Sequence, residues 1–191
     1  MSANQLQFFH AYNKRLTQTL ESFDYTLIER FCQRLLKAWQ EGAQVFFCGN
    51  GGSAANAIHL ANDFIYGVDK PRGIGLRVNA LPANQAVATC LGNDEGYDKI
   101  FSAQLAVLGR PGDVLVCLSG SGNSPNILKA MEQAKNMGID TVAILGYSGG
   151  KAKAMADLPL HFAIDDMQIS EDLQQIVGHM AMRWLYERRP Q

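Results

Sequence analysis

The sequence predicts an α/β fold, a three-layer sandwich with a five-stranded parallel sheet and two leading helices. From residue 44 onward, short β-rich runs alternate with helical windows, which is typical of βαβ units. Runs such as VFFC, VLVCL and VAIL are apolar at every position, as expected of strands covered on both faces. The 191 residues, 47% of them hydrophobic, are enough for one well-buried domain.

Two helices are expected before the sheet, the first over residues 4–21 and the second after an N-cap at Asp24. Their apolar stripes consist of Phe9, Tyr12, Leu16 and Leu20 in the first helix, and of Leu27, Phe31, Leu35 and Trp39 in the second. These stripes must pack on the sheet domain or on another subunit.

Five strands follow, each ending in a turn that in most cases opens a helix. They are expected at Gln44–Cys48, Gly73–Val78, Asp113–Leu118, Thr141–Leu145 and Leu158–Ile164. The last helix is expected to bury a stripe of Ile169, Leu173, Ile176, Met180 and Trp184.

Charge and cysteine content narrow the function classes. Lys and Arg number 17 and Asp and Glu 18, so the net charge of −1 argues against a nucleic-acid binder or a polybasic membrane-surface protein. No apolar run approaches the ~20 residues of a membrane span, and the first residues lack the pattern of a secretory signal. The four cysteines, Cys32, Cys48, Cys90 and Cys117, form no CxxC pair, which favours a reducing, cytoplasmic compartment.

Glycine and serine cluster in two turns that follow strands, at residues 49–53 and 119–125. Glycine lets a backbone approach a ligand closely, and a helix N-terminus offers free N–H groups to an anion. Ser124 suits the N-cap and Pro125 the first helical position. Ordinary βα turns have a similar composition. Two such turns at neighbouring strand ends nevertheless favour a small phosphate ester, and no P-loop lysine or GxGxxG motif is present.

Two helices carry candidate acid–base or metal-binding side chains. His59 and Asp63 are four residues apart and project together from a different face than the apolar stripe of their helix, and Glu171 and His179 lie on the polar side of the last helix. The four-residue spacing of His59 and Asp63 suits a divalent metal or a proton-transfer pair. Taken alone, each pair also fits a solvated polar surface.

Three segments together resemble the sugar isomerase (SIS) domain family and, within it, the sedoheptulose-7-phosphate isomerases. They are GNGGSAANAIHLANDF, CLGNDEGYDKIFSAQL and GRPGDVLVCLSGSGNSPNILKA, and the similarity extends over essentially the whole chain. The resemblance implies a flavodoxin-like SIS domain over residues 1–191 that interconverts an aldose and a ketose. It also implies a cytoplasmic homotetramer with active sites between subunits, in which residues 1–42 form a helical extension used in oligomerisation.

The resemblance also implies roles for individual residues. The sugar phosphate would contact Asn50, Gly51, Gly52, Ser53, Asn93, Asp94, Ser119, Ser121 and Ser124. A divalent metal, expected to be zinc, would be bound by His59, Asp63, Glu171 and His179. Proton transfer would fall to Asp63 and His179, with Glu171 as an alternative base.

Three positions depart from the family pattern. Asp63 stands where the family has Glu, Glu171 where it has Gln, and Gly120 where it has Thr. Two carboxylates at one site would raise one pKa unless a cation intervenes. We therefore expect either a stronger dependence on metal or a base moved to Glu171. Glu171 and His179 are separated by ~12 Å of helix, so a shared ion needs converging side chains, an irregular helix start or a second subunit.

Two other functions fit the same motifs. A relative within the family is a non-catalytic scaffold that binds the replication initiator, although the presence of His59, Asp63 and His179 here favours catalysis. The chain could also bind or isomerise another sugar phosphate, because the two turns do not read the length of a sugar.

Overall fold

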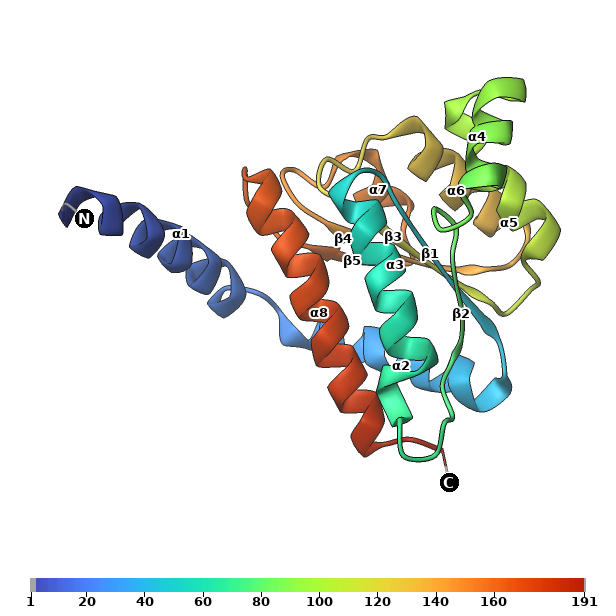
Figure 1. Ribbon diagram of the computed structural model, residues 1–191, viewed down its shortest axis with the longest axis horizontal. Coiled ribbons are helices and arrows are strands. Elements are labelled where there is room, and N and C mark those ends of the chain that lie inside the picture. The colour runs from blue at the N-terminus through green and yellow to red at the C-terminus, as the bar shows by residue number, and fades with distance from the viewer. Residues whose placement is uncertain (1–2, 191) are drawn as a thin grey trace.

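The computed structural model describes residues 3–190, with the side chains of residues 3–5 left aside, and confirms the predicted α/β architecture (Figure 1). The five strands pair in parallel in the order β2-β1-β3-β4-β5. They are β1 (Gln44–Gly49), β2 (Arg77–Ala80), β3 (Val114–Ser119), β4 (Asp140–Leu145) and β5 (Leu158–His161). The helices are α1 (Ala3–Glu21), α2 (Tyr25–Glu41), α3 (Gly52–Ile65), α4 (Gln85–Asp94), α5 (Ser102–Leu108), α6 (Pro125–Asn136), α7 (Gly150–Met155) and α8 (Met167–Glu187), with 3-10 turns η1 (Gly67–Asp69) and η2 (Tyr97–Lys99).

Helices cover both faces of the sheet. Successive strand residues point to opposite faces, so Phe47 packs with α2, α3 and α8 while Phe46 packs with α5, α6 and α7. Both phenylalanines are essentially inaccessible to solvent. The uniformly apolar strands are thus explained by two buried faces, as predicted.

The second strand lies later in the chain than the expected Gly73–Val78. Gly73 adopts a left-handed conformation in a turn, and Gly75 packs so closely on the end of α3 that a Cβ would overlap the carbonyl of Ile65. Pairing with β1 therefore begins only at Arg77, opposite Gln44.

The buried stripe of α8 also differs from the expected one. Ile169 and Leu173 are buried as predicted, but the stripe continues through Val177, Ala181 and Leu185. The predicted residues Ile176, Met180 and Trp184 are only partly buried. The reason is that α8 lies beside both α2 and α3, so its buried surface includes small and polar residues that a purely apolar pattern omits.

The two leading helices behave differently. Asp24 caps α2 by accepting a hydrogen bond from the Thr26 amide. Helix α2 buries its predicted stripe in the core, except that Leu27 is only partly buried. In contrast, α1 projects from the body (Figure 1). Arg15 and Tyr12 tie α1 to the start of α8, through Asp166 at 2.8 Å and through Asp172. Its N-terminal half leaves large apolar side chains such as Phe8 and Phe9 exposed.

Helices α3 and α8 run side by side across one face of the sheet (Figure 1). They pack tightly where Gly178 faces Leu60, since a Cβ at residue 178 would overlap the Leu60 methyl groups. This contact places the polar residues of the two helices opposite one another.

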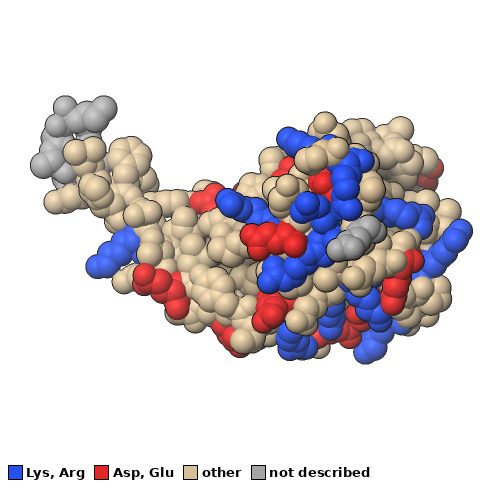
Figure 2. Space-filling model, turned by 90° about the horizontal axis from the view of Figure 1, so that it is seen from below, with Lys and Arg blue, Asp and Glu red and all other residues tan. Residues whose placement is uncertain are grey.

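Between residues 3 and 190, none of the helices combines the length and the apolar character that a membrane span requires. Figure 2 shows Lys and Arg side chains interspersed with Asp and Glu on the face that it presents.

Candidate functional site

The two Gly/Ser turns form one cavity of about 270 Å³ at the carboxyl ends of β1 and β3. Its lining consists of Asn50, Gly51, Gly52, Ser53, Leu118, Ser119, Gly120, Ser121, Ser124, Met167 and Glu171. The chain thus brings together all the predicted substrate-binding residues except Asn93 and Asp94. None of the lining residues is a Lys or an Arg.

The position of the cavity follows from the strand order. From β1 the chain continues through α3 toward β2, and from β3 it continues through α6 toward β4 on the other side. The helices α3 and α6 therefore begin beside each other but cover opposite faces of the sheet. Such a switch point leaves a crevice at the strand ends where α/β proteins bind ligands.

The serine hydroxyls of the second turn are oriented by its backbone. Ser119 Oγ accepts a hydrogen bond from the Gly122 amide at 3.0 Å, and Ser121 Oγ accepts one from the Asn123 amide at 3.3 Å. A hydroxyl that accepts in this way keeps its proton to donate. Ser124 occupies the N-cap as expected, but its side chain makes no capping hydrogen bond.

The turn requires glycine at residue 122. Gly122 has a φ of +64°, and a Cβ there would overlap the carbonyl oxygen of Gly149. The absence of threonine at residue 120 also has a local cause, because the Met167 sulfur lies 2.9 Å from where a Cβ of residue 120 would stand. Met167 thus occupies space that a larger side chain in the turn would need.

The two turns are joined by a pair of amides that sequence reasoning missed. Asn50 Nδ2 donates to Asn126 Oδ1 at 2.9 Å, and Asn126 Nδ2 donates back to Asn50 Oδ1 at 2.8 Å. The Tyr97 hydroxyl also donates to Asn50 Oδ1. Asn126 is only 1% exposed, although it follows a polar turn, and no local pattern distinguishes it from a surface asparagine.

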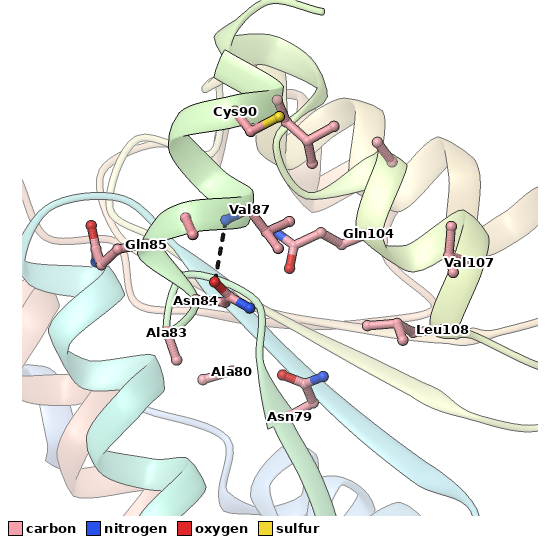
Figure 3. A pocket seen from close by; sticks show the side chains of 13 residues that line it. Asn79, Ala80, Ala83, Asn84, Gln85, Val87, Cys90, Gln104, Val107 and Leu108 are labelled. Atoms are coloured by element: carbon pink, nitrogen blue, oxygen red, sulfur yellow. Dashed lines mark hydrogen bonds between the residues drawn. The ribbon is translucent and has the colours of Figure 1, made fainter. Parts of the chain in front are cut away.

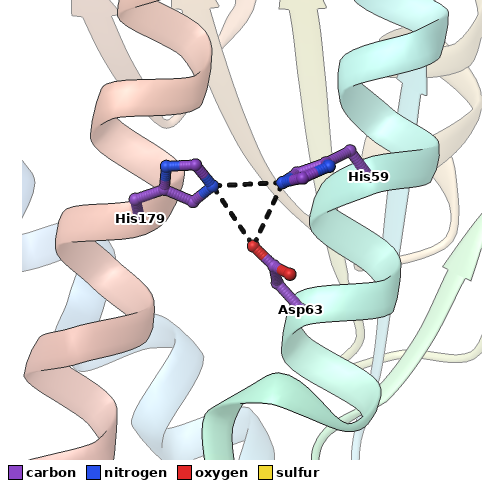
Figure 4. A group of neighbouring side chains, drawn as sticks. All are labelled: His59, Asp63 and His179. Atoms are coloured by element: carbon purple, nitrogen blue, oxygen red, sulfur yellow. Dashed lines mark hydrogen bonds and ion pairs between the residues drawn. The ribbon is translucent and has the colours of Figure 1, made fainter.

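A second group of side chains lies farther along α3 and α8. His59 and Asp63 project from α3 toward His179 on α8 (Figure 4). The two Nε2 atoms are 3.1 Å apart, and Asp63 Oδ2 lies 3.4 Å from His59 Nε2 and 3.2 Å from His179 Nε2. Asp63 therefore reaches both imidazoles despite having one methylene fewer than glutamate.

The three donor atoms are spaced as metal ligands are. Zinc bonds of 2.0–2.2 Å in a tetrahedron separate neighbouring ligand atoms by about 3.3 Å. The separations of 3.1, 3.2 and 3.4 Å among His59, Asp63 and His179 match that value. The residues present therefore fit a divalent metal with at least one position left open.

Three predicted site residues lie away from the place expected for them: Glu171 is outside the group of His59, Asp63 and His179, and Asn93 and Asp94 are outside the cavity. Glu171 is not part of the metal-like group; its carboxylate covers Gly52 in the first turn, where an added Cβ would overlap it. Asn93 and Asp94 lie at the end of α4, with Asn93 donating to Asp94 at 2.7 Å. This bond, together with a second one from the Cys90 thiol, lowers the pKa of Asp94. Neither residue lines the cavity of its own chain.

A groove of about 1150 Å³ lies elsewhere, between α4 and α5 (Figure 3). Its lining consists of Asn79, Ala80, Ala83, Asn84, Gln85, Ala86, Val87, Cys90, Leu91, Ala103, Gln104, Val107 and Leu108. The lining holds no charged residue and no cluster of titratable groups. Its polar groups are the side-chain amides of Asn79, Asn84, Gln85 and Gln104, among mostly apolar neighbours.

Comparisons with known proteins agree with this geometry. The SIS domain model matches residues 7–146. A phosphoheptose isomerase of Akkermansia muciniphila is 42% identical over 82% of this chain and 81% of its own length, and one of Rhodospirillum rubrum is 44% identical over 73% of each chain.

Solved structures show the same similarity. The phosphoheptose isomerase GmhA of Neisseria gonorrhoeae superposes with a TM-score of 0.88 at 29% identity, covering 97% of this chain and 98% of its own. A phosphoheptose isomerase of Francisella tularensis has a TM-score of 0.89 at 26% identity, covering 99% and 100%. The chain therefore belongs to the phosphoheptose isomerase family of SIS-domain enzymes.

Proposed function

We propose that this isomerase interconverts sedoheptulose 7-phosphate and D-glycero-D-manno-heptose 7-phosphate through an enediol. The observation that carries the proposal is the pairing of two sites on α3 and α8: an anion cavity at the helix starts, and the His59, Asp63 and His179 group farther along. This catalytic group also favours an enzyme over a scaffold that only binds a partner.

The distance between the two sites supports a seven-carbon substrate. His59 lies six residues beyond Ser53 on α3, which corresponds to ~9 Å. Seven bonds separate the phosphorus from C2 in an extended sedoheptulose 7-phosphate, a span of roughly 9 Å. A five-carbon ketose phosphate is shorter by two bonds, so its reacting carbons would fall short of the imidazoles.

The phosphate is held without a lysine or arginine. Hydroxyls of Ser119, Ser121 and Ser124 donate to it, and the free N–H groups at the starts of α3 and α6 add to the positive potential of the cavity. Asn50 is held in place by Asn126, so the first turn meets the sugar phosphate in a fixed position.

Proton transfer takes place at the other end of the substrate. The Asp63 carboxylate removes a proton from the carbon beside the carbonyl, which gives the enediol, and returns it to the neighbouring carbon. His179 moves a proton between the two substrate oxygens through the ring nitrogen that does not face the other two donors, a role suited to imidazole near neutral pH. Glu171 lies at the phosphate end, beside Gly52, and is therefore the weaker candidate for the base.

A divalent metal, which we propose to be zinc, would be bound by His59, Asp63 and His179, with Glu171 outside this set in a single chain. When bound, such an ion polarises a carbonyl as a Lewis acid. Because Glu171 lies outside this set, its carboxylate is separated from that of Asp63. The expected repulsion between the two carboxylates is therefore reduced.

The proposed function predicts selectivity for sugar length. With purified protein, kcat/KM for sedoheptulose 7-phosphate should exceed that for five- and six-carbon ketose phosphates at least tenfold, because only the longer chain spans both sites. Product formation followed by NMR measures all three. Equal rates for the shorter sugars would contradict the proposed substrate, and no turnover of any would favour the scaffold function.

We further propose that residues 1–191 form one SIS domain that assembles into a cytoplasmic homotetramer through its N-terminal extension, residues 1–42. The projecting half of α1 exposes Leu6, Phe8 and Phe9, and the groove between α4 and α5 is a second uncharged surface. Asn93 and Asp94 would serve the cavity of a neighbouring subunit, which explains why they line none in their own chain.

Assembly predicts the effect of charge on α1. Replacing both Phe8 and Phe9 by Glu should shift the sedimenting species from tetramer to smaller forms at micromolar concentration, since charged side chains oppose burial of the helix. The matched control replaces Ile74, an exposed apolar residue outside both the extension and the groove, by Glu and should leave the tetramer intact. A wild-type monomer by sedimentation would contradict the proposal.

A further inference from the structure

Between the anion cavity and the histidine group, α3 and α8 are connected by a network of hydrogen-bonded polar side chains, to which the mechanism proposed above assigns no step. Its members are Ser53 and Asn56 of α3 and Gln174 and Gln175 of α8. Gln174 is 1% exposed and Ser53 4% exposed, whereas Asn56 and Gln175 are half-buried, so the Ser53 end of this polar network lies inside the helix contact. Buried amides are as a rule hydrogen-bonded, and Gln175 Oε1 is the one buried atom of the four side chains without a partner among the described residues.

The direction of these hydrogen bonds is fixed by one backbone group. Asn56 Nδ2 lies 2.9 Å from the carbonyl oxygen of Glu171, which can only accept, so the nitrogen of this amide must face α8. The same nitrogen lies 3.0 Å from Gln174, whose oxygen must therefore face Asn56. The nitrogen of Gln174 is then directed at Ser53 Oγ, at 3.0 Å.

This order leaves the Ser53 hydroxyl with a free proton. Because Ser53 Oγ accepts from Gln174, its O–H is available as a donor, and it donates to no other group among the described residues. Ser53 lines the anion cavity together with Ser119 and Ser121, whose hydroxyls are set in the same way by backbone amides. The cavity thus presents three hydroxyls that each accept from the protein and keep a proton for a ligand.

We propose that Gln174 is a positioning residue that orients the Ser53 hydroxyl as a donor to the substrate phosphate. It acts through Ser53 and does not contact the reacting carbons. The proposal rests on the proposed function in one respect, that the phosphate occupies the cavity between the two turns.

The test is a double-mutant cycle between residues 174 and 53. Gln174→Met keeps the length of the side chain but has no donor, so the KM for sedoheptulose 7-phosphate and the inhibition constant of inorganic phosphate should both rise about tenfold, with kcat changed less than threefold. In a Ser53→Ala background the same substitution should change neither constant more than twofold. The control is Gln175→Met, which removes the hydrogen bond from Gln175 to Asn56, a bond of the same polar network that does not involve Ser53. In this variant the KM and the inhibition constant of phosphate should both stay within twofold of wild type.

Two results would overturn the inference: unchanged constants in Gln174→Met, or an equal rise in both backgrounds. Thermal melts show whether each variant folds. If Gln174→Met does not fold, Gln174→Glu repeats the cycle with the same shape, and its carboxylate should weaken phosphate inhibition even more by accepting the Ser53 proton. Failure of the proposed function looks different, because the wild-type enzyme would then neither turn over the heptulose phosphate nor be inhibited competitively by inorganic phosphate.

Discussion

Replacing Asp63 by Asn should lower kcat about 100- to 10,000-fold while KM changes little. The substitution keeps the shape of the side chain but removes the base, and general-base catalysis contributes a factor of this size. KM should be preserved because the phosphate is held at the other end of α3, in a cavity that Asp63 does not line. Steady-state kinetics with sedoheptulose 7-phosphate measures both constants.

The matched control is Glu171→Gln, which removes the other carboxylate and likewise keeps the shape of the side chain. Because Glu171 covers Gly52 in the first turn, we expect KM to change and kcat to stay within tenfold of wild type. The reverse pattern, a collapse of kcat in Glu171→Gln and near-normal turnover in Asp63→Asn, would assign the base to Glu171.

Removing divalent metal should reduce turnover at least 100-fold, and zinc should restore it. The three donor atoms of His59, Asp63 and His179 lie 3.1–3.4 Å from one another, the spacing expected of ligands on one zinc ion. Removal of the ion would leave the substrate carbonyl without a Lewis acid. Activity after EDTA treatment and dialysis, followed by addition of zinc, measures the effect.

Metal content provides a second measurement that does not depend on turnover. His59→Ala should lower the zinc bound per chain, determined by atomic emission, because it removes one of three donors. His161→Ala is the control, since His161 lies on β5 and contacts the carbonyl of Tyr147 instead. A metal-free wild-type enzyme with full activity would refute the metal-dependent part of the mechanism.

Most of the fold could be predicted because it depends on local patterns. Continuous apolar runs predicted the buried strands, and the cap at Asp24 and the four-residue repeat predicted α2. The errors arose where tertiary contacts decide the outcome. The start of β2 is set by the packing of Gly75 on α3, and the buried stripe of α8 is set by its two neighbouring helices.

The candidate site was predicted to a similar extent. The clustering of glycine and serine indicated the two turns, and the spacing of His59 and Asp63 indicated a polar pair. Only the resemblance to the family joined His179, together with Glu171, to that pair. The structure separates Glu171 from that group, because its position eight residues before His179 carries it to the far end of the helix contact. Asn126 and Gln174 were missed because their importance comes from partners 76 and 121 residues away in sequence.

The contact between Leu60 and Gly178 has a consequence for the chemistry as well as for packing. These residues are the immediate neighbours of His59 and His179, so this contact between the two helices also sets the gap between the two imidazoles. Gly178 therefore acts as a spacer, because a methyl group at residue 178 would push α8 away from Leu60 and widen that gap. The distance between the two histidines thus depends on a packing contact in which neither of them takes part.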